Sequence, residues 1–104
     1  MLNVYFDPNK GIAVADGKLE EYALGQFKES LKWSYCPHTI QVSNATTVDM
    51  FRCLINQGKI DHSQIRFYFG GNQIEFNEKG WFTGNFDDYP KELLISETLL
   101  RELE

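Results

Sequence analysis

The 104-residue sequence predicts an α/β protein, with an α+β arrangement as the alternative, and three observations lead to that prediction. Short runs of β-branched and aromatic residues alternate with segments whose apolar residues recur every three or four positions. These runs and segments follow one another in the order ββαβαβββα. Aromatic residues make up 14% of the chain, which is enough bulky surface for a core. We therefore expect a small mixed sheet with helices packed on it, in one domain spanning residues 1–104.

The first third of the chain contains two predicted strands and one predicted helix. Residues 2–6 and 12–15 are short and apolar, and the residues between them are rich in turn formers, so we expect a hairpin. Asp16 is placed to cap a helix whose apolar positions follow the helical repeat from residue 19 to residue 31. This helix must end before Pro37, because the residue that precedes a proline is pushed out of helical geometry.

A third strand and a second helix are predicted next. Residues 39–43 are short and β-branched, which is typical of a strand. Asn44, Thr46 and Thr47 offer caps for a helix that runs to about Gln57. The apolar residues of this helix cover a wider arc than one solvent-exposed helix normally shows, so we expect it to be packed on more than one side.

The remaining residues predict a small meander and a last helix. Residues 65–69 are apolar on both faces, as in a central strand. Residues 74–76 and 81–83 follow as antiparallel strands, and Pro90 fits the first turn of a helix. The alternation of strand and helix from residue 12 to residue 69 favours two right-handed crossovers onto a parallel core. The alternative is a sheet in which every strand pairs antiparallel.

The distribution of charge argues against direct nucleic-acid binding. The formal net charge is −5, and residues 75–104 hold eight acidic residues against three basic ones. The ten basic residues form no cluster of the kind that binds phosphates. The sequence also shows no signal peptide and no apolar run long enough for a membrane span, so we expect a cytoplasmic protein in which Cys36 and Cys53 are thiols.

The sequence contains no recognisable catalytic, cofactor or metal pattern. Residues 11–19 carry two glycines followed by a lysine, but the glycines are one residue too far apart for a phosphate-binding loop and no hydroxyl follows the lysine. Cys36, His38, Cys53 and His62 are zinc-ligand types at a spacing that matches no common zinc site. We therefore expect a protein that is not an enzyme and has no cofactor and no metal.

One polar corner supports an alternative function. Asn44, Thr46 and Thr47 lie between the carboxyl end of a predicted strand and the start of a helix. Open α/β sheets bind anions at such corners, because free N–H groups and the helix dipole converge there. A small anion- or nucleotide-binding domain is the function this corner would serve, and ordinary helix capping is the simpler interpretation.

Aromatic and acidic residues gather after residue 80 and form the main set of candidate partner contacts. Interfaces favour this composition, although the aromatic residues would equally suit a core. We expect a non-enzymatic protein-binding or regulatory module that binds another protein through its acidic C-terminal region and aromatic meander, or self-associates. An acidic decoy that copies nucleic-acid charge is a further alternative. The candidate contacts are Trp81, Phe82, Phe86, Asp87, Asp88 and Tyr89.

Residues 40–103 resemble the C-terminal portion of ABC-type chromosomal ATPases related to the overcoming-lysogenization-defect (OLD) and RecF-like proteins. The segments that carry the resemblance are IQVSNATTVDMFRCLINQGKIDHSQIRFYF, IEFNEKGWF and DDYPKELL. In that family a strand ending in a His-Ser switch leads to a helix, a connection containing Gly-Lys-Ile, a strand, a short meander and a proline before the last helix.

The catalytic positions of that family differ here. Asn44 and Ala45 stand where the family has its His-Ser pair, and Asp16 and Gly17 stand where its Walker B acids would be. The Walker A loop and the signature motif are absent from the sequence. The resemblance therefore implies an ATPase-like half-fold that does not hydrolyse ATP, but docks on or imitates part of a larger ATPase-type complex.

Overall fold

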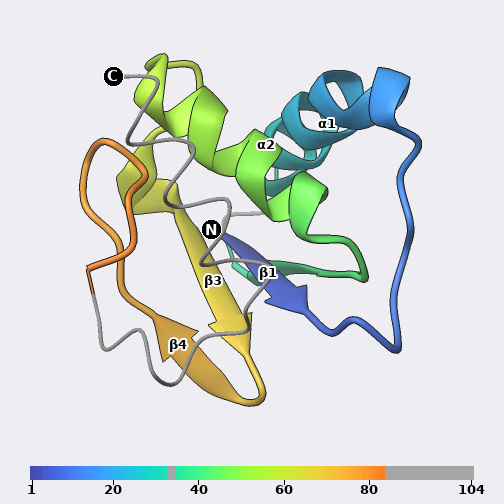
Figure 1. Ribbon diagram of the computed structural model, residues 1–104. Helices are drawn as coiled ribbons and strands as arrows, with labels where there is room; N and C mark the ends of the chain where they lie inside the picture. The colour runs from blue at the N-terminus through green and yellow to red at the C-terminus, as the bar shows by residue number, and fades with distance from the viewer. Residues whose placement is uncertain (33–34, 84–104) are drawn as a thin grey trace.

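The computed structural model describes residues 1–32 and 35–83, which form a mixed α/β fold as the sequence predicts (Figure 1). Two helices and four named strands make up the described part of the chain, with a short 3-10 turn before α1 and another before β3. In chain order the elements are β1 (Leu2–Phe6), η1 (Asp16–Lys18), α1 (Leu19–Leu31), β2 (His38–Val42), α2 (Ala45–Asn56), η2 (His62–Gln64), β3 (Ile65–Phe69) and β4 (Asn72–Ile74).

The sheet has the strand order β2-β1-β3-β4. β1 pairs parallel with β2 on one side and with β3 on the other, whereas β4 pairs antiparallel with β3. In this register Val4 lies opposite both Ile40 and Phe67, and Ile74 extends the same row. Because partners in one row share a face, these four apolar side chains all lie on one side of the sheet.

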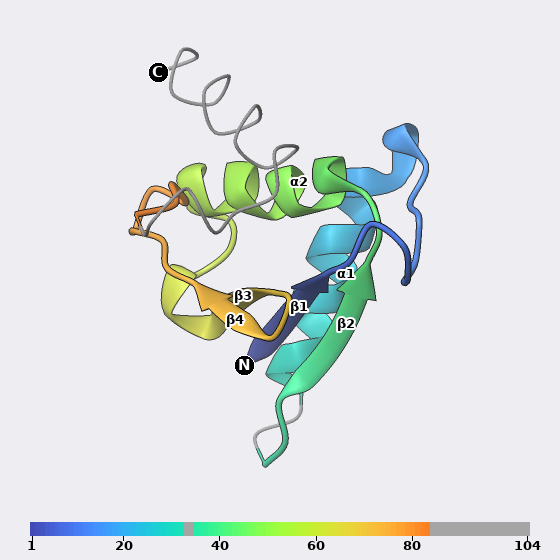
Figure 2. The same cartoon turned by 60° about the horizontal axis from the view of Figure 1, so that its bottom comes forward.

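Both helices pack on that same side (Figures 1 and 2). On α1, Gln26 lies 2.7 Å from Nε2 of His38, whose side chain belongs to the row of alternate residues that continues through Ile40. On α2, the ring of Phe51 packs edge-on against Phe67, with their centroids 6.5 Å apart. The described elements thus form two layers, one of helix and one of sheet.

The predicted handedness of the two crossovers is wrong for one of them. The chain moves from β1 to β2 in one direction across the sheet and from β2 to β3 in the opposite direction, because β1 lies between them. Two crossovers that run in opposite directions over the same face have opposite hands, so one of the two is left-handed. The right-handed rule is strong but statistical, and packing both helices over one apolar face has taken precedence over it here.

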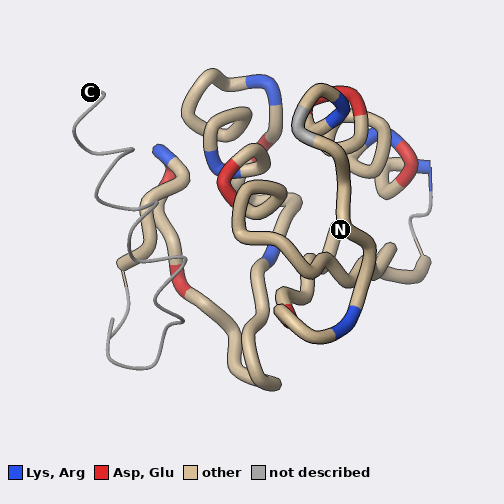
Figure 3. Tube along the Cα trace, turned by 45° about the vertical axis from the view of Figure 1, so that its right-hand side comes forward, with Lys and Arg blue, Asp and Glu red and all other residues tan. Residues whose placement is uncertain are grey.

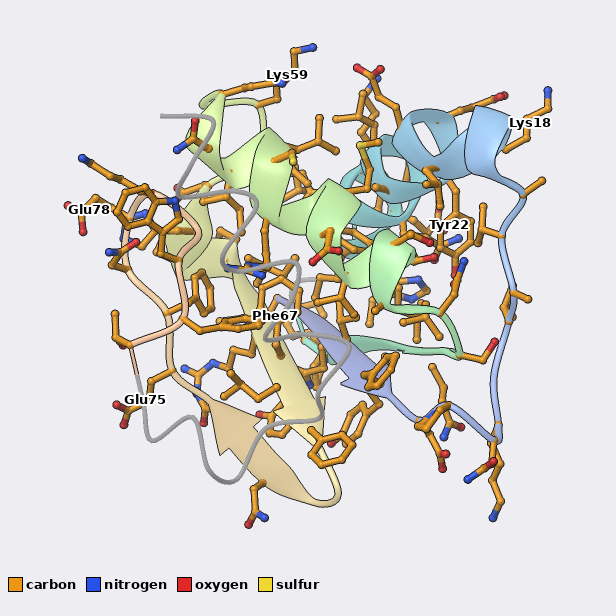
Figure 4. The ribbon with its side chains drawn as sticks, in the orientation of Figure 1. Lys18, Tyr22, Lys59, Phe67, Glu75 and Glu78 are labelled. Atoms are coloured by element: carbon orange, nitrogen blue, oxygen red, sulfur yellow. The ribbon has the colours of Figure 1, made fainter. Side chains whose placement is uncertain are left out.

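The core lies between the helices and the sheet, with Phe67 near its centre (Figure 4). Phe67 is 1% exposed and meets Phe51, Phe76 and Phe82 in edge-to-face contacts at centroid distances of 5.1–6.5 Å. Edge-to-face pairs at these distances add stabilisation beyond the burial of their area. Aromatic side chains in the core therefore pack β3 against α2 and against the segment after β4.

Residues 12–15 do not form the hairpin predicted with residues 2–6. Ile12 instead makes an isolated parallel bridge with Val42, on the outer edge of β2. Its N–H donates to the carbonyl of Gln41 at 2.9 Å, and its own carbonyl accepts from Ser43 at 3.2 Å. Gly11 permits this approach, because its φ is +116° and a Cβ there would lie 2.8 Å from the carbonyl oxygen of Gln41.

The first residues of α1 and α2 differ in part from the caps that the sequence predicts. Asp16 begins the turn η1 rather than capping α1, which starts at Leu19 with no side-chain cap. Asn44 holds the N-cap position of α2, as predicted, but its side chain does not bond the helix backbone. At the other end, Gly58 follows the C-cap with φ +77°, and its N–H donates to the carbonyl of Ile55.

α2 is packed on more than one side, as its wide apolar arc predicts, and its buried Arg52 holds the segment after β4. Nε of Arg52 donates to the carbonyl of Gly80 at 2.8 Å, and its guanidinium lies 3.8 Å from the centroid of the Phe82 ring. Phe82 makes an isolated antiparallel bridge with Phe76, which is what remains of the predicted strand pair 74–76 and 81–83. The arginine thereby satisfies the Gly80 carbonyl inside the core.

Candidate interaction surface

The structure places two of the six candidate partner contacts, and one of them belongs to the core. Phe82 is 0% exposed and packs in the core. Trp81 is half-buried, and Nζ of Lys79 lies 5.3 Å from its ring centroid. Of the predicted aromatic contacts, Trp81 thus stays accessible. The other four candidates, Phe86, Asp87, Asp88 and Tyr89, lie outside the described residues.

The polar corner at the start of α2 is occupied by its own hydrogen bonds. Nδ2 of Asn44 donates to the carbonyl of Val14 at 3.2 Å and lies 3.0 Å from Oγ1 of Thr46. The hydroxyl of Thr47 is buried and donates to Oδ1 of Asn44 at 2.5 Å. These bonds tie the chain before α1 to the start of α2. The three side chains therefore link the two segments, although none of these bonds is a side-chain cap of the α2 backbone.

The four residues of zinc-ligand type are distributed over different parts of the fold: Cys36 precedes β2, His38 is in β2, Cys53 is in α2 and His62 is in η2. His38 bonds Gln26, and Cys53 lies half-buried on α2, where burial and the nearby Asp49 carboxylate raise the pKa of its thiol. Cys36 is exposed in the connection between α1 and β2. Within residues 1–32 and 35–83, no three His, Cys, Asp or Glu side chains come together in a group that could hold a metal ion.

The sheet face opposite the helices is a surface that the sequence interpretation missed. No described helix covers it, and its strand residues are half-buried or exposed. Tyr5 on β1 and Tyr68 on β3 are opposite one another in register, and their rings stack with centroids 4.6 Å apart and planes at 11°. The stacked rings form a ridge over the two central strands. The polar residues around this ridge are Asn3, Thr39, Gln41, Arg66 and Gln73.

We call this surface the open face: the side chains of Asn3, Tyr5, Thr39, Gln41, Arg66, Tyr68 and Gln73. Arg66 is its one ionic group, since β1, β2 and β4 contain no Lys, Arg, Asp or Glu. Figure 3 shows the charged residues of the described chain gathered on the helices and the connections, with little charge along the strands. A face that is poor in charge but rich in tyrosine is unlike the rest of the surface.

Two hollows flank the tyrosine ridge. One, of about 410 Å³, is lined by Tyr5 together with Thr39 and Gln41 on β2. The other, of about 320 Å³, is lined by residues at the amino ends of β1 and β3 and by the connection before β2. Its lining includes Asn3, Arg66, Tyr68, Cys36 and Pro37. The open face is therefore a ridge between two depressions rather than a flat sheet surface.

An alternating pattern in the sequence could have revealed this face. Asn3 and Tyr5 alternate with apolar residues in β1, as do Thr39 and Gln41 in β2. Such alternation is typical of a sheet with one face packed and the other in contact with solvent or a partner. In β3 the pattern is weaker, because aromatic residues stand on both faces.

Comparison with known proteins identifies no relative of this chain. No family model, no curated protein and no solved structure is significantly similar to this chain. Neither of the helices in the described part of the chain is long and apolar enough to cross a membrane. The open face and its chemistry thus carry the functional argument.

Proposed function

We propose that this chain is a non-enzymatic protein-binding module whose docking surface is the open face of its sheet. One observation carries the proposal: the parallel strands β2, β1 and β3 are covered by helices on one face only within the described residues. Parallel sheets are almost always covered on both faces. A second protein that covers the open face would complete the layer that such a sheet normally has.

The composition of the open face supports a protein partner. The buried centre of a protein interface is depleted in Lys, Asp and Glu and enriched in Tyr and Arg, and hot spots are enriched in Tyr, Trp and Arg. Tyr5, Tyr68 and Arg66 are residues of these enriched types. The amide and hydroxyl groups around them can form the hydrogen bonds of an interface rim.

The resemblance to OLD and RecF-like ATPases suggests which class of partner to test first. It implies a half-fold that docks on, or imitates, part of an ATPase-type complex. An open sheet face fits such a role, because a half-fold lacks one of the layers that cover the sheet of a complete α/β domain. Trp81, which remains accessible beside Lys79, is a secondary contact in this proposal.

Site-specific photo-cross-linking tests the proposal. A benzophenone amino acid placed at Gln41 or Gln73, on the open face, should cross-link to another protein in the native cell. The matched controls place the same residue at exposed positions away from that face, Lys28 on α1 and Gln57 after α2. We expect one protein to be captured from the two open-face positions and not from the controls. Equal capture from both pairs, or none from the open face, would contradict the proposed function.

A further inference from the structure

We infer that the exposed segment 12–14 is a docking edge for a second copy of this chain, and that two copies pair there antiparallel about a two-fold axis at Ala13. This surface is separate from the open face. The segment belongs to the connection between β1 and η1, which runs along one side of the molecule (Figure 1). Ile12 bridges to the outer edge of β2, so the segment stands where a further strand of the sheet would lie.

The backbone of Ala13 faces away from the sheet. The N–H and C=O of Ile12 both bond the β2 side, and the carbonyl of Val14 accepts from the side chain of Asn44 on that same side. Because alternate residues of an extended chain direct their backbone groups to opposite edges, those of Ala13 point outward. Ala13 is exposed, and no hydrogen bond joins its backbone to a described residue. It therefore offers one donor and one acceptor at an open sheet edge.

The side chains of the segment supply a projecting group and a hollow. Ile12 lies opposite Val42, whose row faces the helices, and bridge partners share a face of the sheet. Ile12 is nevertheless 55% exposed. Two positions further along, Val14 lines a hollow of about 350 Å³ at the start of α1, together with Lys18, Glu21 and Tyr22. An exposed apolar side chain and a place for one thus lie next to each other.

These features complement themselves about a two-fold axis. In an antiparallel pair centred on Ala13, the two Ala13 residues exchange both of their N–H···O bonds. Ile12 of one copy then lies directly opposite Val14 of the other copy, on the same face. Each copy thereby places its Ile12 at the hollow of the other. Two-fold dimers with such a self-complementary interface are the commonest oligomers of soluble proteins.

The distribution of charge favours a second copy as the occupant. Residues 11–15 contain no charged residue, and Lys18 and Glu21 at the hollow lie 3.6 Å apart as an ion pair. The chain as a whole carries a net charge of −5, so two copies repel each other least where the surface is uncharged. Natural proteins often protect exposed sheet edges with lysine or proline, and residues 11–15 include neither.

This pairing leaves the open face free. Antiparallel pairing of two sheet edges places the two-fold axis roughly perpendicular to the sheet. The helices of both copies then lie on one side of the joined sheet, and both open faces lie on the other. The edge pairing is thus independent of the proposed function, and either can fail alone.

Disulfide trapping in the whole chain tests the register. Ala13→Cys and its matched control Ala15→Cys are each made in a Cys36→Ser background, which removes the exposed native thiol. The Cα atoms of the two Ala13 residues would be about 5.5 Å apart, within reach of a disulfide, whereas those of the two Ala15 residues would be roughly 14 Å apart. With oxidised glutathione as the oxidant, we expect Ala13→Cys to form a covalent dimer at least tenfold faster.

Sedimentation velocity measures the reversible association. An interface this short binds weakly, so the chain is followed from about 10 μM to about 1 mM. We expect the wild type to move from monomer towards dimer over this range. Ile12→Lys should weaken the association at least tenfold, because it places a charge at the paired edge and changes only an exposed side chain. Gln73→Lys, which adds the same charge to the open face, should leave the association unchanged.

Several results would overturn the inference. Equal trapping rates for the two cysteine variants, or a wild type that stays monomeric up to about 1 mM, would each do so. Association that survives Ile12→Lys but is lost in Gln73→Lys would place the contact between copies on the open face instead. Photo-cross-linking from Gln41 and Gln73 reads the open face alone, so failure of the proposed function and failure of the edge pairing are separate results.

Discussion

The two faces of the sheet are made by neighbouring residues of the same strands, yet one face is packed against helices and the other is not covered by any described helix. Phe67 faces the helices and is surrounded by three aromatic rings, whereas Tyr68, the next residue, faces away and stacks on Tyr5. The helix-side face gains its stability from close apolar packing. On the open face, the rings of Tyr5 and Tyr68 stack on each other, and no helix of the described residues covers them. The two faces therefore differ in what their aromatic rings do: on one face they pack inside the core, and on the other they form a stacked, half-buried pair.

The largest expected effect comes from substituting this pair of neighbours. Phe67→Ala should lower the free energy of unfolding by about 3–5 kcal/mol, because it removes the ring at the centre of the core. Tyr68→Ala should lower it by only about 1 kcal/mol, because it removes a half-exposed ring and one stacked contact. Urea unfolding of both variants measures the difference. Equal losses would mean that the open face is part of the stabilising core and would break the comparison.

A second test concerns the segment that closes the helix-side core. Gly80 has φ +84°, and a Cβ there would lie 2.6 Å from the carbonyl oxygen of Arg52, so Gly80→Ala combines backbone strain with a backbone clash. We expect it to lower the unfolding free energy by about 3 kcal/mol.

Gly71 provides the matched control, since its φ is +85° and no atom lies within 4 Å of its Cβ position. Gly71→Ala should therefore cost about 1–2 kcal/mol, for the backbone conformation alone. Thermal and urea unfolding of the two variants, side by side, isolate the clash. If both alanines cost the same, the contact between Gly80 and α2 is looser than the structure shows.

A third, smaller effect tests the corner at the start of α2. Asn44→Ala removes the link to the carbonyl of Val14 and the acceptor for the buried hydroxyl of Thr47, so we expect a loss of about 1–2 kcal/mol. Thr46→Ala, at an exposed position, should change stability by less than about 0.5 kcal/mol. A thermal shift with inorganic phosphate that disappears in Asn44→Ala would instead support anion binding at this corner.

Much of the helix-side architecture could be predicted from the sequence, because it depends on local patterns. The segments 19–31 and 45–56 carry helical periodicity, and Gly58 ends the second helix as expected. The predicted hairpin of residues 2–6 and 12–15 was wrong, because strand pairing depends on contacts between segments that are distant in the sequence. Ile12 would be extended whether it paired with β1 or with β2. It pairs with Val42 of β2, because Gly11 allows the chain to approach that strand closely.

The candidate site shows the same division between local pattern and long-range pairing. Trp81 and Phe82 were both predicted as contacts, because composition alone does not say which of two adjacent aromatic residues points inward. Phe82 is the one that points inward, where its ring packs against Phe67 of β3 and the Arg52 guanidinium of α2. The pairing of Tyr5 with Tyr68 and of Asn3 with Arg66 joins residues more than sixty positions apart, which no local pattern specifies.

The smallest expected effect concerns the entry to β3, whose register decides which side chains reach each face. Asp61 accepts hydrogen bonds from the hydroxyl of Ser63 at 2.7 Å and from its backbone N–H at 2.9 Å, and these bonds lower the pKa of the Asp61 carboxyl. A carboxyl with a lowered pKa in the folded state stabilises the protein above its unfolded pKa of about 3.9, and this stabilisation is lost as the pH falls through the folded value.

Asp61→Asn keeps the acceptor but removes the charge. Urea unfolding from about pH 6 down to pH 3 should therefore show wild type slightly more stable than the variant at the upper end, with the difference shrinking as the pH falls below the unfolded pKa. A difference that stays constant with pH would show that the charge of Asp61 plays no part in setting the start of β3.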